Sequence, residues 1–149
     1  MSRQWSGGIC LRKNASGIEI LLVCEPSESD LKDSYRWSLP GGKCCDNYGK
    51  MVSCCTETPE QTIIRESKEE TGYDIVTVRL FGQEEKDMHK RYVFVINIVA
   101  GHPLGKKIPG DKESPAWFPI KSLPRNTFPS HRRIIEQYVL SRIKARSPK

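Results

Sequence analysis

Apolar residues gather in short runs that alternate with polar stretches along most of the chain. Two such runs, residues 5–12 and 18–24, flank the turn-forming sequence KNASG and predict a β-hairpin. Three later runs predict further strands at residues 74–83, 91–101 and 116–120. Because polar segments with Gly, Pro and Ser separate these runs, we expect a strand-rich fold with surface loops.

A helix is signalled in the middle of the chain. Thr58 is a predicted N-cap, and Gln61 stands three residues later, which completes a capping box. Pro59 suits the first helical position, and Gly72 is a typical stop. These signals predict a helix over residues 59–71.

The end of the chain, residues 131–146, has apolar residues at helical spacing and predicts an amphipathic helix. Mixed strands with one central and one terminal helix favour an α+β fold, with both helices packed on a mixed sheet. A chain of 149 residues with 37% hydrophobic content can bury one core. We therefore expect a single domain over residues 1–149.

The net charge of the chain indicates which kind of ligand it is suited to bind. The chain has 24 Lys and Arg residues against 18 Asp and Glu, a formal net charge of +6, which favours anionic ligands such as phosphates. No run approaches the ~20 apolar residues of a membrane span, and the first residues have no apolar stretch of signal-peptide length. We predict a cytoplasmic protein that does not contact a membrane.

Six cysteines are present, four of them in an irregular segment at about residues 44–56. Because the cytosol keeps thiols reduced, we predict no structural disulfide. The adjacent pairs Cys44-Cys45 and Cys54-Cys55 lack the spacing that structural zinc sites favour. Packing of these side chains as small apolar groups is therefore favoured over zinc binding.

Carboxylates are concentrated in RESKEETG, residues 65–72. At helical spacing, Glu66, Glu69 and Glu70 fall within an arc of about 100°. A solvated acidic face with salt bridges to Arg65 would explain much of this stretch. The glycine turn of LPGGK favours the alternative, a Mg²⁺ site, because backbone groups there can approach a metal or a diphosphate closely.

The same residues resemble a known family. Glu57, seven intervening residues and RESKEETG match most of the signature of the Nudix hydrolases. In that signature a glycine stands six residues before the first glutamate, where this chain has Met51. Gly42 lies fifteen residues before Glu57, which indicates a nine-residue insertion within the Cys-rich segment. The carboxylates keep their register.

The resemblance implies the Nudix fold, in which a mixed β-sheet is sandwiched between helices (an α/β/α sandwich). It also implies a Mg²⁺ or Mn²⁺ cofactor, whose ligands would be Glu66, Glu69, Glu70 and the backbone carbonyl of Gly42. Arg65 and Glu57 would then be the pair that holds the acidic helix face in position.

The reaction that the resemblance implies is attack of water on a phosphorus of a nucleoside diphosphate linked to another moiety, X. The general base stays open between a helix carboxylate, Glu66 or Glu69, and Glu113 in the later loop GDKESPAW. The residues expected to take part in catalysis are therefore Glu66, Glu69, Arg65 and Glu113.

Two segments outside the acidic helix are candidates for substrate recognition. FPSHRR stands where relatives that accept nucleoside triphosphates carry base-contacting side chains, and KDMHKRY is similar to a stretch in relatives that cleave dinucleoside polyphosphates or diphosphoinositol polyphosphates. The substrate contacts we expect are Gly41, Gly42, Lys43, Lys90, Arg91, Tyr92, Phe128 and His131. The expected substrate is a nucleoside triphosphate or a related nucleotide, with the polyphosphates as the alternative.

A second alternative is a binding module with this fold, for a nucleotide or RNA. The basic C-terminal helix could supply a phosphate footprint for it. The full set of glutamates disfavours this alternative, because a module that only binds needs no metal ligands. The oligomeric state, monomer or homodimer, stays open.

Overall fold

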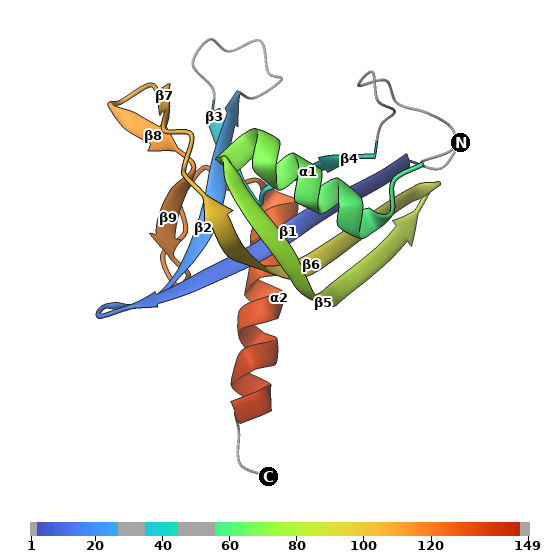
Figure 1. The fold of residues 1–149 in the computed structure, drawn as a ribbon. Coiled ribbons are helices and arrows are strands. Elements are labelled where there is room, and N and C mark those ends of the chain that lie inside the picture. The colour runs from blue at the N-terminus through green and yellow to red at the C-terminus, as the bar shows by residue number, and fades with distance from the viewer. Residues whose placement is uncertain (1–2, 27–34, 45–55, 147–149) are drawn as a thin grey trace.

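The computed structural model describes residues 3–26, 35–44 and 56–146 (Figure 1). The strands are β1 (Arg3–Asn14), β2 (Gly17–Pro26), β3 (Tyr35–Ser38), β4 (Gly41–Lys43), β5 (Tyr73–Lys86), β6 (His89–Gly101), β7 (Lys106–Ile108), β8 (Lys112–Ser114) and β9 (Ala116–Pro119). The helices are α1 (Pro59–Thr71) and α2 (Pro129–Arg146). Most of the Cys-rich segment lies outside the described residues.

The main sheet is mixed and has the order β3-β2-β1-β6-β5. β1 runs parallel to β6, whereas the other pairs in the sheet are antiparallel. The first half of β1 also pairs with β4, and its second half pairs with β2. This division of β1 places the glycines of β4 beside Ser6 and Gly7, next to the helix α1 (Figure 1).

Apolar side chains cover both faces of the sheet. One buried cluster joins Ile63 of α1 to Ile75 and Ile96. The other joins Ile134 and Ile135 of α2 to the opposite face of the sheet. One helix therefore covers each face, which confirms the predicted α+β class and its α/β/α layering (Figure 1).

Local signals set the bounds of α1. The Thr58 side chain accepts a hydrogen bond from the Gln61 N–H, and the Gln61 side chain accepts one from the Thr58 N–H. Gly72 ends the helix in the left-handed region, with a φ of 86°. The predicted helix, residues 59–71, is confirmed at both ends.

The hairpin of β5 and β6 is longer than predicted. The predicted strands, residues 74–83 and 91–101, leave residues 84–90 between them, but only Asp87 and Met88 form the turn, both with positive φ. The charged residues pair across the strands instead, with Glu84 opposite Arg91 and Glu85 opposite Lys90. Because opposite charges across a strand pair are favourable, this polar stretch continues the ladder.

No helix within the described ranges is long and apolar enough to cross a bilayer.

Candidate active site

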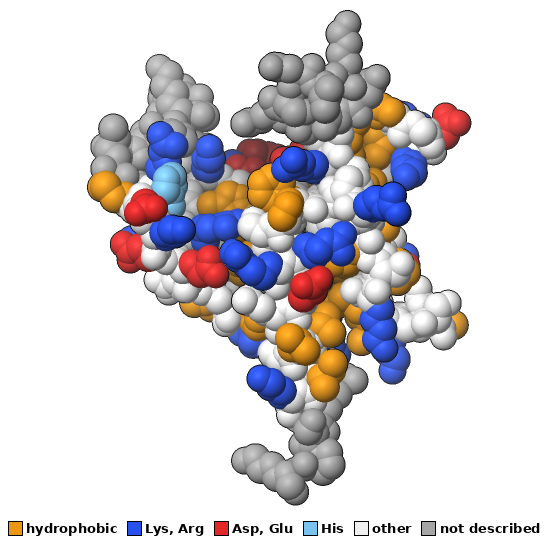
Figure 2. Space-filling view, turned by 180° about the vertical axis from the view of Figure 1, so that it is seen from behind, with side chains coloured by type: hydrophobic (Ala, Val, Ile, Leu, Met, Phe, Trp, Pro, Cys, Tyr) orange, Lys and Arg blue, Asp and Glu red, His pale blue; other side chains and the backbone are white. Residues whose placement is uncertain are grey.

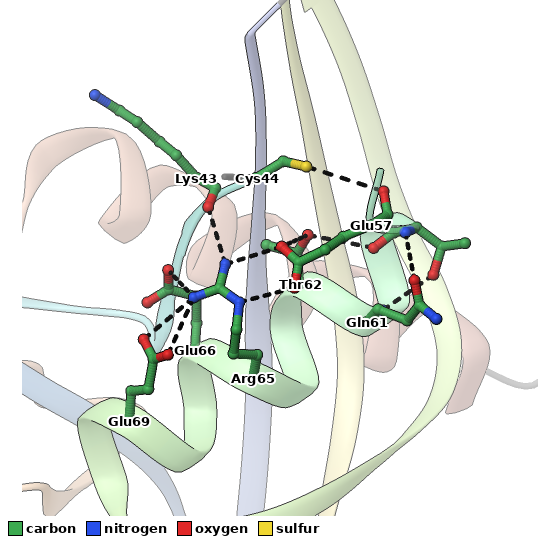
Figure 3. Close-up of polar contacts among 9 residues, drawn as sticks. Lys43, Cys44, Glu57, Gln61, Thr62, Arg65, Glu66 and Glu69 are labelled. Atoms are coloured by element: carbon green, nitrogen blue, oxygen red, sulfur yellow. Dashed lines mark hydrogen bonds and ion pairs between the residues drawn. The ribbon is translucent and has the colours of Figure 1, made fainter. Parts of the chain in front are cut away.

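Arg65 makes most of the polar contacts on the polar face of α1 (Figure 3). Its guanidinium donates to both oxygens of Glu57, with Nε to Oε2 at 2.8 Å and Nη2 to Oε1 at 2.9 Å. Nη1 donates to Glu66 at 3.0 Å and to Glu69 at 3.2 Å. Nη2 also donates to the carbonyl of Lys43 at 3.2 Å. The hydrogen bond with Glu57 is the main cause that raises the pKa of Arg65, so this residue is a fixed cation that joins α1 to β4.

Glu66 lies against a glycine that leaves it room. A Cβ added at Gly42 would fall 2.2 Å from the Glu66 carboxyl carbon, so a larger residue at this position would displace the carboxylate. The Glu66 side chain is 17% exposed, and its burial raises the pKa of the carboxyl group despite the nearby Arg65 charge. Gly42 of β4 and Glu66 of α1 are therefore in direct contact.

Glu70 connects α1 to the first residue of β4. Its Oε1 accepts the Gly41 N–H at 2.7 Å. Burial raises the pKa of Glu70, and a hydrogen bond with the side chain of Glu25 acts in the same direction. The carboxyl groups of Glu70 and Glu25 therefore lie next to each other in the site.

Glu25 is the carboxylate that the sequence analysis missed. The signal was present in IEILLVCE, where Leu21 packs on the α1 side of the sheet and Cys24 on the α2 side. Strand alternation then places Glu25 on the same face as Leu21, toward α1. A polar residue that continues the strand pattern at this point could have been included with the glutamates of the helix.

The donor chemistry of these residues fits a divalent cation, because carboxylate oxygens and a close backbone carbonyl are the ligands that Mg²⁺ prefers. The glycine cradle at Gly42 also lets the backbone approach. No three acidic, His or Cys side chains of the described residues converge on one ion position. Glu66 and Glu69 both accept hydrogen bonds from Nη1 of Arg65, which brings these two carboxylates to the same cation.

A cavity of about 680 Å³ adjoins the carboxylates, and Glu25 and Gly41 are part of its wall. Its volume lies within the ~300–1,000 Å³ of small-molecule sites. The cationic side chains of the wall are Arg3, Lys43, Lys86, Lys90, Arg91 and Arg133. Figure 2, turned by 180° from Figure 1, shows many Lys and Arg side chains on this side of the molecule. Glu25, Glu84 and Asp87 are the acidic residues of the wall, so its cationic side chains are in excess, which suits an anionic ligand.

Six of the eight predicted substrate contacts line this cavity: Gly41, Lys43, Lys90, Arg91, Phe128 and His131. Gly42 is not part of the wall and instead faces Glu66. Tyr92 is not part of the wall either, and it packs against the apolar cluster on the α1 side of the sheet. Neighbouring residues of a strand point to opposite faces, so Arg91 and Tyr92 diverge.

Aromatic rings form one side of the cavity. His131 lies between Trp5, with ring centroids 5.1 Å apart, and Phe128, at 5.3 Å. The guanidinium of Arg91 lies 5.2 Å from the centroid of the Trp5 ring. Trp5 is a second residue that the sequence analysis missed. Its ring has room because Gly7 and Gly41 have no Cβ, which at Gly7 would fall 2.1 Å from the indole.

Glu113 lies on β8 and forms an ion pair with Lys107 across the β7–β8 hairpin. Its side chain is half exposed, and it is not among the residues that line the cavity. The structure therefore does not bring Glu113 into contact with the carboxylates of α1. Glu66 and Glu69, the other two candidates for the base, share Arg65.

The prediction of no structural disulfide is wrong, because Cys44 is disulfide-bonded. That prediction rested on the expected compartment, whereas disulfide formation also depends on which sulfurs the fold brings together. The Cys44 sulfur lies 3.9 Å from the Glu57 carbonyl oxygen, a contact drawn in Figure 3. Cys10 and Cys24 are free and buried. Cys45, Cys54 and Cys55, and with them the zinc question, lie outside the described residues.

Comparison with known proteins identifies the relatives of this chain. Residues 3–138 match the family model described as NUDIX domain. A Caenorhabditis elegans protein named "Putative nudix hydrolase 1" is 34% identical over 124 residues, which are 81% of this chain and 30% of that protein. The "8-oxo-dGTP diphosphatase" of Proteus vulgaris is 37% identical over 88 residues, 59% of this chain and 65% of that protein. The chain thus spans less than two thirds of either curated relative.

A solved structure gives the same result for the fold. The NUDIX hydrolase from Nitrosomonas europaea has a TM-score of 0.67 with this chain at 18% identity, over 95% of this chain and 90% of that one. At this level of identity the likeness concerns the fold alone.

Proposed function

Because the chain belongs to the Nudix family, we propose that it is a Mg²⁺- or Mn²⁺-dependent hydrolase of a nucleoside triphosphate or related nucleotide. The bond cleaved is a phosphoanhydride in a nucleoside diphosphate linked to X. The main observation behind the proposal is that Gly41 belongs both to the wall of the cavity and to the surroundings of the α1 carboxylates. Gly41 lines the cavity and donates its N–H to Glu70, so the cavity wall is directly hydrogen-bonded to a carboxylate of α1.

The proposed metal ligands are Glu66, Glu69, Glu70 and the carbonyl of Gly42. A divalent cation held by them would neutralise the diphosphate and lower the pKa of a bound water. Arg65 holds Glu66 and Glu69 on one side of its guanidinium and Glu57 on the other (Figure 3). Its role in this proposal is to orient these carboxylates, since one rigid cation fixes all three.

The remaining roles follow from charge and position. Lys43 lines the cavity beside Gly41, where its ammonium group can bind phosphate oxygens. Lys90 and Arg91 extend this positive charge along the wall. Phe128 and His131 lie where a base can stack. We propose Glu66 or Glu69 as the general base, because both lie on the acidic face.

A substrate panel tests the function. Purified protein is incubated with nucleoside triphosphates, nucleotide sugars, ADP-ribose, dinucleoside polyphosphates and diphosphoinositol polyphosphates, each with Mg²⁺, Mn²⁺ or EDTA, and products are identified by chromatography. Metal-dependent release of a nucleoside monophosphate and pyrophosphate from a triphosphate supports the proposal. Activity confined to the polyphosphates favours the alternative substrate class. Binding of a nucleotide or RNA with no turnover of any phosphoanhydride favours a binding module.

A further inference from the structure

His131 has two ring nitrogens in different surroundings. Nδ1 accepts the backbone N–H of Leu39 at 3.0 Å, across 92 positions of sequence. A nitrogen that accepts a hydrogen bond carries no proton, so the proton of the neutral ring is on Nε2. Burial, and secondarily the charge of Arg91, lowers the pKa of His131 to about 4. At neutral pH the ring therefore has one acceptor, Nδ1, which is bound to Leu39, and one donor, Nε2–H.

The donor is available to a ligand. The part of the chain that the structure describes supplies no acceptor for Nε2. Nε2 is also not among its buried polar atoms that lack both a partner and solvent, which are Ser6 Oγ and Ser67 Oγ. His131 is only 7% exposed, and its ring forms part of the cavity wall. A buried side chain thus keeps one N–H free where a ligand would lie.

Arg91 adds donors on the same wall. Its guanidinium lies over Trp5 and donates to Ser130 Oγ at 3.3 Å. A guanidinium has five N–H groups, so others are left for a ligand. Together, Arg91 and His131 present donors beside the rings of Trp5 and Phe128.

We infer that the His131 Nε2–H is a specificity-determining donor that selects a base with an acceptor edge, such as O6 and N7 of a 6-oxopurine, over a 6-aminopurine. This inference rests on the proposed nucleotide substrate. A 6-oxopurine presents two acceptors on that edge, whereas adenine presents one acceptor and an amino donor. An amino group that faces N–H donors leaves them unpaired, which costs affinity.

The probes are inosine and adenosine monophosphates, which have a carbonyl and an amino group at C6, respectively. Binding is measured by calorimetry without metal, so the result does not depend on hydrolysis. We expect the inosine nucleotide to bind the natural protein about 10-fold more tightly, the factor that one or two hydrogen bonds supply.

Two substitutions separate recognition from structural support. In His131→Asn the side-chain oxygen stands near the position of Nδ1 and can accept from Leu39, but the distal donor is lost. His131→Gln reaches the position of Nε2 and keeps a donor there, but loses the acceptor near Leu39. His102→Asn is the control, because His102 is exposed and is not part of the cavity wall.

We expect His131→Asn to melt close to the natural protein and to lose the preference for inosine. His131→Gln should melt lower and keep the preference, and His102→Asn should change neither property. Equal binding of the two probes to the natural protein overturns the inference, as does a preference that survives in His131→Asn. If His131→Asn does not fold, loss of the preference in folded His131→Gln overturns it.

Hydrolysis separates this inference from the proposed function. Turnover of inosine and adenosine triphosphates at equal kcat/KM, unchanged in the His131 variants, overturns the inference and leaves the function standing. Absence of both binding and turnover for every nucleotide overturns both.

Discussion

Arg65 and Glu57 form a two-pronged ion pair, with Nε to Oε2 at 2.8 Å and Nη2 to Oε1 at 2.9 Å. The pair joins the residue that precedes the N-cap of α1 to the middle of the helix. Because Nη1 of the same guanidinium contacts Glu66 and Glu69, the ion pair also fixes the orientation of the acidic face.

Arg65→Lys should therefore impair both stability and activity. A lysine carries the charge but cannot bind Glu57 through two nitrogens while it also contacts Glu69. We expect a loss of about 1–2 kcal/mol in the free energy of unfolding, measured with urea. We also expect kcat to fall about 10-fold or more. Arg12→Lys is the matched control, because Arg12 pairs with Glu19 at the exposed end of the first hairpin. Equal effects of the two substitutions on stability and kcat would argue against a role for the two-nitrogen contact between Arg65 and Glu57.

Glu70→Gln should lower turnover at least ~10²-fold and leave the fold intact. The amide oxygen can still accept the Gly41 N–H, so the melting temperature without metal should be unchanged or slightly higher. The rise in melting temperature on addition of Mg²⁺ or Mn²⁺ should shrink, since a ligand charge is lost. Glu60→Gln, on the first turn of the same helix, is the control. Near-normal activity in Glu70→Gln with Mg²⁺ would refute the proposed metal ligand.

The pKa of His131 predicts how stability responds to acid. The folded pKa of about 4 lies below the value of 6.5 for an unperturbed histidine. Between these values the unfolded chain binds the proton and the folded chain does not, so this residue makes stability fall as the pH drops from 6.5 to 4. Urea unfolding of the metal-free protein at several pH values should show this loss. His131→Asn should have a shallower decline over the same interval, and an identical decline would contradict the shifted pKa.

Glu113→Gln tests the position of the general base. Glu113 pairs with Lys107 and is not part of the cavity wall, so we expect kcat to change less than ~3-fold. A general base usually contributes ~10²–10⁴ in rate, and a loss of that size would place the base on β8. The pH profile of kcat distinguishes this result from a folding defect, because a missing base removes one limb of the profile.

The sequence alone determined α1 and the register of its carboxylates. The N-cap Thr58, the capping residue Gln61 and the stop at Gly72 act within a few residues of the helix ends. Such interactions are encoded locally, so their residue spacing suffices to predict them. The same applies to the first hairpin, whose turn sequence and flanking apolar runs are adjacent.

Only the tertiary structure decided how the cavity is assembled. Trp5, Glu25 and His131 come from three distant segments, and no spacing in the sequence relates them. Strand alternation turned Arg91 toward the cavity side and Tyr92 toward α1, a choice that depends on the register of β6 against β1. The hydrogen bond from Leu39 to His131 likewise joins residues 92 positions apart. Contacts of this kind form because packing of the two helices on opposite faces of the sheet brings the segments together, and packing is a property of the whole fold.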